Sequence, residues 1–167
     1  MDVRVSDVKK WAGREERTTL TEPWPEVLKE RLDAQIEQPA RVHVVVRNVA
    51  SGLLVEISGE AHLQVPCSRC LSDAKLTLAF SDSQEFREEA GPQDPTLDYQ
   101  RFTGDRIPLD EMVSDAVALE LPLAPLCIPE CRGLCPQCGT NWNVGECSCQ
   151  APTDPRWERL KGWTENP

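Results

Sequence analysis

Eight cysteines, arranged as four close pairs, constrain this chain more than any other feature of its 167 residues. Five of them lie in the stretch CRGLCPQCGTNWNVGECSC, residues 131–149. The first residues lack the pattern of a secretory leader, and no run of about 18 apolar residues predicts a membrane span. We therefore expect a cytoplasmic protein without a membrane partner. In that reducing compartment, closely spaced cysteines indicate metal binding or redox chemistry rather than disulfides.

The most specific cysteine pattern is Cys135-Pro-Gln-Cys138-Gly, followed by Cys147-Ser-Cys149. A CxxC turn lets two thiolates reach one ion, and the glycine after it permits a positive φ. A second close pair completes a tetrahedral Cys₄ site, the usual arrangement for structural zinc. Four free thiols are the less favoured alternative, because the two close pairs have ligand spacing.

The other four cysteines, Cys67, Cys70, Cys127 and Cys131, form a second predicted zinc site. A thioredoxin-like function for the CSRC pair would require a helix N-terminus in a βαβ unit, whereas this pair follows a predicted strand and precedes another. Two structural Cys₄ sites account for all eight cysteines, and neither keeps an open position for water. An exchange of Cys131 with Cys135 between the sites, or a labile first site, stays open.

Alternation of apolar and polar residues predicts three antiparallel strands. The first begins at Arg41, the second runs to Val65 after a short turn, and the third begins at Ala74. Gly59, on the apolar face of the second strand, predicts a bend or bulge. The PCSRCLSD stretch, residues 66–73, is then a hairpin tip that carries the first cysteine pair.

Other segments predict helices and a loop. Four-residue spacing of apolar residues predicts a helix over Glu26–Ile36, and the acidic stretch at residues 82–98 predicts a mobile loop. A strand is expected near residues 99–103, then a helix from Pro108 to Pro122. A last short helix is expected in DPRWERLKGW, residues 154–163. The buried face of the longer helix is predicted to consist of Leu109, Met112, Val113, Ala116 and Leu119.

Together these elements predict an α+β fold: an antiparallel, barrel-like β-sheet with a few helices and a C-terminal cysteine-rich zinc ribbon. Residues 1–126 are expected to form the α+β core domain, including the acidic loop at about 82–98. Residues 127–167 are expected to form the cysteine-rich zinc segment and the short C-terminal helix, packed on the core.

The net charge of −10 bears on the choice of partner. Eight thiolates would add −8 and two Zn²⁺ ions +4, so metal loading takes the formal charge to about −14. Such a surface repels phosphate and favours a basic protein partner over the backbone of a nucleic acid. His43 and His62 fall on polar strand faces, where solvated imidazoles are expected rather than ligands or acid–base catalysts.

The ordered combination of motifs resembles one family. PCSRCL on the hairpin, LDEMVSDAVALELPLAPLC, CRGLCPQCGTNWNVGECSC and DPRWERLKG are together similar to the YceD family, bacterial proteins described as large-ribosomal-RNA-subunit accumulation proteins. The resemblance covers about residues 40–163. It implies support for the synthesis, processing or stability of large-subunit rRNA during ribosome assembly. It also implies that the C-terminal cluster is scaffold, because family members differ in keeping it.

We therefore expect a non-enzymatic factor with two structural zinc ions that binds a basic ribosomal protein or a large-subunit assembly intermediate. Two other functions remain as alternatives. One is an enzyme, either a metal-dependent nuclease in rRNA processing or a thiol redox protein, which needs an open metal position or an activated thiol. The other is a zinc module that contacts rRNA directly. The acidic loop at residues 82–98 is the expected steering element for a basic partner.

Overall fold

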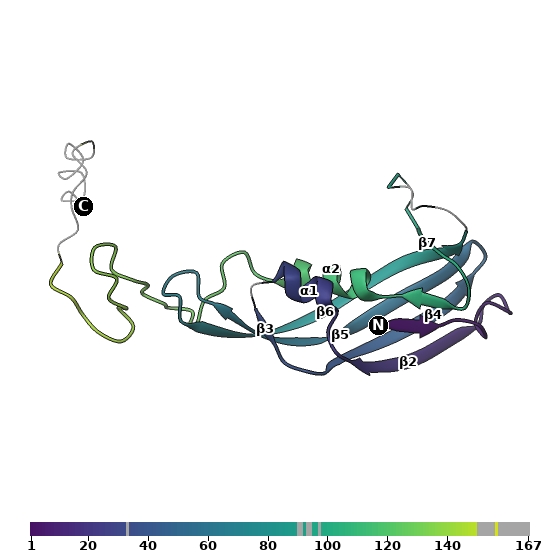
Figure 1. Ribbon diagram of the computed structural model, residues 1–167, viewed down its shortest axis with the longest axis horizontal. Helices are drawn as coiled ribbons and strands as arrows, with labels where there is room; N and C mark the ends of the chain where they lie inside the picture. The colour runs from purple at the N-terminus through teal and green to yellow at the C-terminus, as the bar shows by residue number, and fades with distance from the viewer. Residues whose placement is uncertain (33, 90–91, 93–94, 97, 150–155, 157–167) are drawn as a thin grey trace, which may run out of the picture.

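A computed structural model of the chain describes residues 1–32, 34–89, 92, 95–96, 98–149 and 156 (Figure 1). Its main feature is a six-stranded sheet that curls into a half-barrel, with the helices α1 and α2 on one side of it. Helix α2 packs on strand β6, and α1 packs on α2. Among these residues, no helix has the length and apolar character needed to cross a bilayer. In chain order, the elements are β1 (Asp2–Arg4), β2 (Glu15–Glu22), α1 (Glu26–Arg31), β3 (Gln35–Ile36), β4 (Ala40–Val49), β5 (Gly52–Pro66), β6 (Asp73–Glu88), β7 (Gln100–Phe102), β8 (Arg106–Pro108) and α2 (Asp110–Glu120).

The three central strands confirm the alternating pattern. Strands β4, β5 and β6 are antiparallel neighbours, and their alternating apolar residues are buried in β4 and β5 and buried or half-buried in β6. The β5–β6 ladder ends at the pair Pro66 and Asp73, so residues 66–73 form the predicted hairpin tip. This tip lies at one end of the elongated molecule, beside the cysteine-rich segment (Figure 1).

Gly59 does not mark a bulge against β6, because the β5–β6 ladder is continuous through it, whereas the β4–β5 ladder ends at this residue. It pairs with Val42 on β4 and with Phe80 on β6. A Cβ atom at this position would lie 2.7 Å from Cζ of Phe80 and 2.8 Å from the carbonyl oxygen of Arg41. The glycine is therefore needed for the close approach of the aromatic ring.

The helices differ in detail from the predictions. Helix α1 ends at Arg31, and Ile36 lies instead in β3, paired with Leu63. The longer helix is where the pattern predicted it, but Leu119 is 85% exposed and Val117 takes the buried position. Residues three or four positions apart share a helix face, so both Leu119 and Val117 fit the apolar pattern. The packing of the helix on the sheet determines which of the two is buried.

The prediction of an acidic loop at residues 82–98 is wrong for its first part. Strand β6 continues to Glu88, because Phe86 pairs with Leu53 and is buried. The expected strand near residue 100 is present as β7, but it pairs with β6 in parallel, so the sheet is mixed rather than wholly antiparallel. The remainder of the predicted loop at residues 90, 91, 93, 94 and 97, and the predicted helix at 154–163 apart from Arg156, lie outside the described residues.

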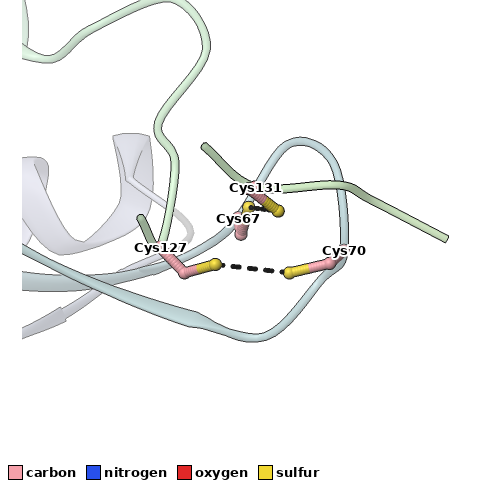
Figure 2. Close-up of side chains that lie close together, drawn as sticks. All are labelled: Cys67, Cys70, Cys127 and Cys131. Atoms are coloured by element: carbon pink, nitrogen blue, oxygen red, sulfur yellow. Dashed lines mark hydrogen bonds between the residues drawn. The ribbon is translucent and has the colours of Figure 1, made fainter. Parts of the chain in front are cut away.

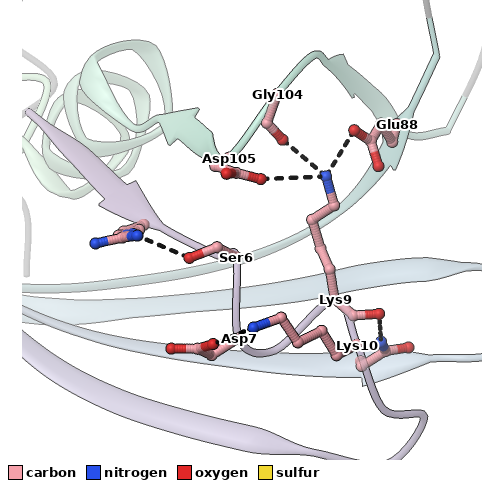
Figure 3. Close-up of polar contacts among 9 residues, drawn as sticks. Ser6, Asp7, Lys9, Lys10, Glu88, Gly104 and Asp105 are labelled. Atoms are coloured by element: carbon pink, nitrogen blue, oxygen red, sulfur yellow. Dashed lines mark hydrogen bonds and ion pairs between the residues drawn. The ribbon is translucent and has the colours of Figure 1, made fainter.

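The N-terminal segment contributes strands that the sequence did not predict. Strand β2 pairs with β4 along its whole length, and β1 pairs with β8. Between β1 and β2, the ammonium group of Lys9 lies 2.6 Å from the carboxylate of Glu88 and donates a hydrogen bond to the carbonyl of Gly104 at 2.9 Å (Figure 3). Lys9 thus ties the N-terminal segment to the end of β6 and to the turn before β8.

Candidate metal centres

The first set of cysteines joins the hairpin tip to the segment after α2. Cys67 and Cys70 lie on the tip, and Cys127 and Cys131 lie on the segment after α2. The two parts are also joined by a backbone hydrogen bond, from the Ser68 amide to the Pro125 carbonyl at 2.8 Å. The sulfurs of Cys67 and Cys131 are 3.8 Å apart, and those of Cys70 and Cys127 are 3.4 Å apart (Figure 2). All four sulfur atoms lie within 4.8 Å of one another.

These distances fit a tetrahedral zinc site. Zn–S bonds of about 2.3 Å place the sulfurs of a regular tetrahedron about 3.8 Å apart. The separations of 3.8 Å and 3.4 Å are close to this value and far longer than the roughly 2.05 Å of a disulfide bond. The set could hold a metal ion with little rearrangement of its side chains.

The second set consists of Cys135, Cys138, Cys147 and Cys149, whose sulfurs also lie within 4.8 Å of one another. The amide of Gly139 donates to the Cys135 carbonyl at 2.9 Å, and Gly139 has a φ of 72°. The glycine after the CxxC pair therefore has the positive φ that the turn requires. The eight sulfurs form the same two groups that the spacing predicted, with Cys131 in the first and Cys135 in the second.

The thiols of each set are unequal before any metal binds. Burial raises the pKa of Cys67, but hydrogen bonds from the backbone of Arg69 and Cys70 outweigh it and lower that pKa to about 6. The neighbouring Cys70 sulfur and partial burial raise the pKa of Cys127 to about 12. Likewise, hydrogen bonds donated by the side chain and backbone of Thr140 lower the pKa of Cys138 to about 6. Four thiolates at this separation need a cation between them, because their mutual repulsion otherwise keeps some of them protonated.

Donors from neighbouring residues support both sets, and the sequence did not predict them. Arg69 donates from Nη1 to the Cys131 carbonyl at 2.8 Å. Asn143 donates from Nδ2 to the Cys131 sulfur at 3.3 Å, and Trp142 donates from Nε1 to the Cys147 sulfur at 3.4 Å. The available signal was the presence of amide and indole donors between the two cysteine pairs of the second set.

The two histidines lie away from both sets. Nδ1 of His43 is 3.0 Å from the Thr19 hydroxyl, and Nδ1 of His62 is 3.1 Å from the Thr77 hydroxyl. Both side chains are on exposed strand positions, as their place on the polar faces predicted.

The family comparison bears on the same part of the chain. The model of the family described as "Large ribosomal RNA subunit accumulation protein YceD" matches residues 55–162, which include both cysteine sets. The chain belongs to the YceD family. Its match begins inside β5, later than the residue 40 that the motifs suggested. No solved structure matches this YceD-family chain.

Curated relatives of this YceD-family protein come from mycobacteria. An uncharacterized protein of Mycobacterium tuberculosis H37Rv is 35% identical over 118 residues, which cover 69% of this chain and 57% of the relative. An uncharacterized protein of Mycobacterium leprae is 29% identical over 125 residues, 73% of this chain and 58% of the relative. The chain thus spans less than two thirds of the length of these relatives.

Proposed function

We propose that this protein is a non-enzymatic, zinc-binding factor that supports large-subunit rRNA accumulation and ribosome assembly by docking a basic ribosomal protein, alone or within an assembly intermediate. The observation that carries the proposal is the gathering of all eight cysteines into two compact sets, in a YceD-family chain of net charge −10. The metals would hold the shape of a docking surface.

The donor sets support a structural role for the metals. Four thiolates around one zinc ion leave no open position where water or substrate could bind. Within the part of the chain that the structure describes, only these two sets bring three or more His, Cys, Asp or Glu ligand atoms together. A metal-dependent nuclease would need a site of a different kind.

The proposed docking surface is the cysteine-rich end, which we define as the hairpin tip at residues 66–73 together with residues 120–149. Leu71 at the tip is 69% exposed and has a φ of 60°. A left-handed conformation costs a residue other than glycine roughly 1–2 kcal/mol. An exposed leucine is therefore unfavourable at this position unless its side chain contacts a partner. The same end also exposes the apolar residues Leu123, Ile128 and Val144 and the acidic residues Asp73, Glu120, Glu130 and Glu146.

A partner rich in Lys and Arg fits this surface. Complementary charge speeds encounter, and exposed apolar side chains then contribute contact area. Three carboxylates at the other end of the sheet are less available to bind a basic partner, because they already form ion pairs within the chain. Glu85 pairs with Arg87, Glu88 with Lys9 and Glu89 with Arg101.

Affinity capture from cell lysate, with and without RNase, tests the proposal. One variant neutralises the cysteine-rich end, with Asp73→Asn, Glu120→Gln, Glu130→Gln and Glu146→Gln. A control variant removes the same charge from the other end, with Asp82→Asn, Glu85→Gln, Glu88→Gln and Glu89→Gln. Ribosomal proteins captured after RNase should decrease for the first variant and persist for the control.

Three outcomes would count against the proposal. Loss of every ribosomal protein after RNase would indicate that RNA forms the bridge, as in a directly RNA-binding zinc module. Equal losses for the two charge variants would reject the cysteine-rich end as the docking surface. Metal-dependent cleavage of rRNA by the purified protein would identify an enzyme.

A further inference from the structure

The segment Asn141-Trp142-Asn143 belongs to the loop of the second cysteine set, yet it contacts the first set. Asn143 donates from Nδ2 to the Cys131 sulfur at 3.3 Å, and its Oδ1 accepts the Arg132 amide at 2.8 Å. One amide side chain therefore binds both a ligand atom of the first set and the backbone just after it. Asn141 adds a hydrogen bond from Nδ2 to the Ser72 hydroxyl on the hairpin tip at 3.2 Å.

The same segment is held on its other side by the second set. The Trp142 indole donates from Nε1 to the Cys147 sulfur at 3.4 Å, while its backbone amide donates to the Gly133 carbonyl at 3.0 Å. Gly133 lies in the three-residue connection between Cys131 and Cys135, which belong to different sets. The connection and residues 141–143 thus run side by side between the two sulfur clusters, bridged at Leu134 and Asn141.

We propose that residues 141–143 couple the two metal sites, so that zinc bound by the second set raises the zinc affinity of the first set. Binding at the second set closes the loop from Cys138 to Cys147 and fixes Asn143 beside Cys131. A fixed amide donor holds the Cys131 sulfur in the position that the other three ligands of the first set require, as outer hydrogen bonds to metal ligands do. By linkage, zinc at the first set raises the affinity of the second set by the same factor.

The expected size of the coupling follows from the role of outer donors. Loss of a hydrogen bond to a metal ligand typically costs roughly 10-fold to 100-fold in metal affinity. Because Asn143 makes one hydrogen bond to one of the four ligands, we expect a loss of zinc affinity near the lower limit of this range, about tenfold. This inference rests on the proposed metal binding.

Four variants of the full chain isolate the effect. Cys138→Ser with Cys149→Ser disables the second set, and Asn143→Ala removes the proposed link. The two changes are also combined, so that a double-mutant cycle is complete. Val144→Ala is the matched control, since Val144 is in the same loop and is 88% exposed. Zinc affinity is measured by competition with a chromophoric chelator, and the thiolate-to-Co²⁺ charge-transfer band is recorded for each protein.

The coupling predicts that disabling the second set lowers the zinc affinity of the first set about tenfold. Asn143→Ala alone should lower it by a similar factor, shift the cobalt band of the first set and add little when the second set is already disabled. Val144→Ala should change neither quantity.

Two results would overturn the coupling. One is an equal first-set affinity in the full chain and in the protein with the second set disabled. The other is an Asn143→Ala effect of equal size in both backgrounds. Two zinc ions bound independently would reject the coupling and leave the proposed function in place, whereas a protein that binds no zinc would reject both.

Discussion

Loss of the first metal site should destabilise the fold more than loss of the second. Cys70→Ser and Cys135→Ser form a matched pair, because the two side chains are 5% and 4% exposed and each belongs to one set. The two sets differ in the parts of the fold that they connect. Cys67, Cys70 and Cys131 belong to the main hydrophobic core, and Cys127 packs against it, whereas Cys135 is buried outside that core.

The difference in stability follows from the lengths of the two loops. A metal at the first set closes a loop of 57 residues between Cys70 and Cys127. A metal at the second set closes a loop of only about 9 residues between Cys138 and Cys147. Loop-closure entropy grows as (3/2)RT ln n, so the longer loop gives roughly 1.6 kcal/mol more stabilisation. For a chain of this size, that corresponds to roughly 3–6 °C in Tm.

Thermal unfolding of the zinc-loaded proteins, followed by circular dichroism, measures this difference. Cys70→Ser should have the lower Tm, and native mass spectrometry should show that each variant retains one zinc ion. Equal Tm values for the two variants, or a lower Tm for Cys135→Ser, would refute the claim that the first set stabilises the sheet more than the second.

Two further predictions concern the sheet and the hairpin tip. Gly59→Ala should destabilise the protein by about 1–3 kcal/mol in urea unfolding, because the new methyl group would overlap the Phe80 ring, whereas Gly145→Ala, with nothing within 4 Å, should be near neutral. An unchanged urea midpoint for Gly59→Ala would contradict the packing described here. Leu71→Gly should keep the stability within about 1 kcal/mol, since glycine adopts a positive φ freely, but should reduce the capture of ribosomal proteins. Undiminished capture would remove Leu71 from the docking surface.

The sequence predicted the parts of the fold whose pattern comes from a buried face. Val42, Val44 and Val46 alternate because one side of β4 faces the core, and α2 follows from apolar residues at helical spacing. Strand β2 was missed because EERTTLTE is an edge strand whose side chains are mostly exposed, so its pairing with β4 leaves little apolar signal. The pairing of β1 with β8 joins residues about 100 positions apart, which no local pattern records.

The cysteine sets were more predictable than their surroundings. Spacing favoured the two sets that the structure brings together, because two close pairs are the common way to build four ligands, although it left an exchange of Cys131 with Cys135 open. The supporting donors depend on tertiary contacts: Arg69 reaches the carbonyl of Cys131 from the hairpin, and Asn143 reaches the Cys131 sulfur from the loop of the second set. The end of β6 misled the prediction because its acidic residues suggested a solvated loop, while Phe86 and the pairing with β5 extend the strand.

X-ray absorption at the zinc edge, on protein purified with its own metal, tests most directly the claim that the metals are structural. We expect two zinc ions per chain, each surrounded by four sulfur atoms at about 2.3 Å and by no oxygen or nitrogen ligand. A zinc ion with an oxygen or nitrogen ligand, which indicates an open and reactive position, would contradict a structural role for the metals, as would a protein without zinc.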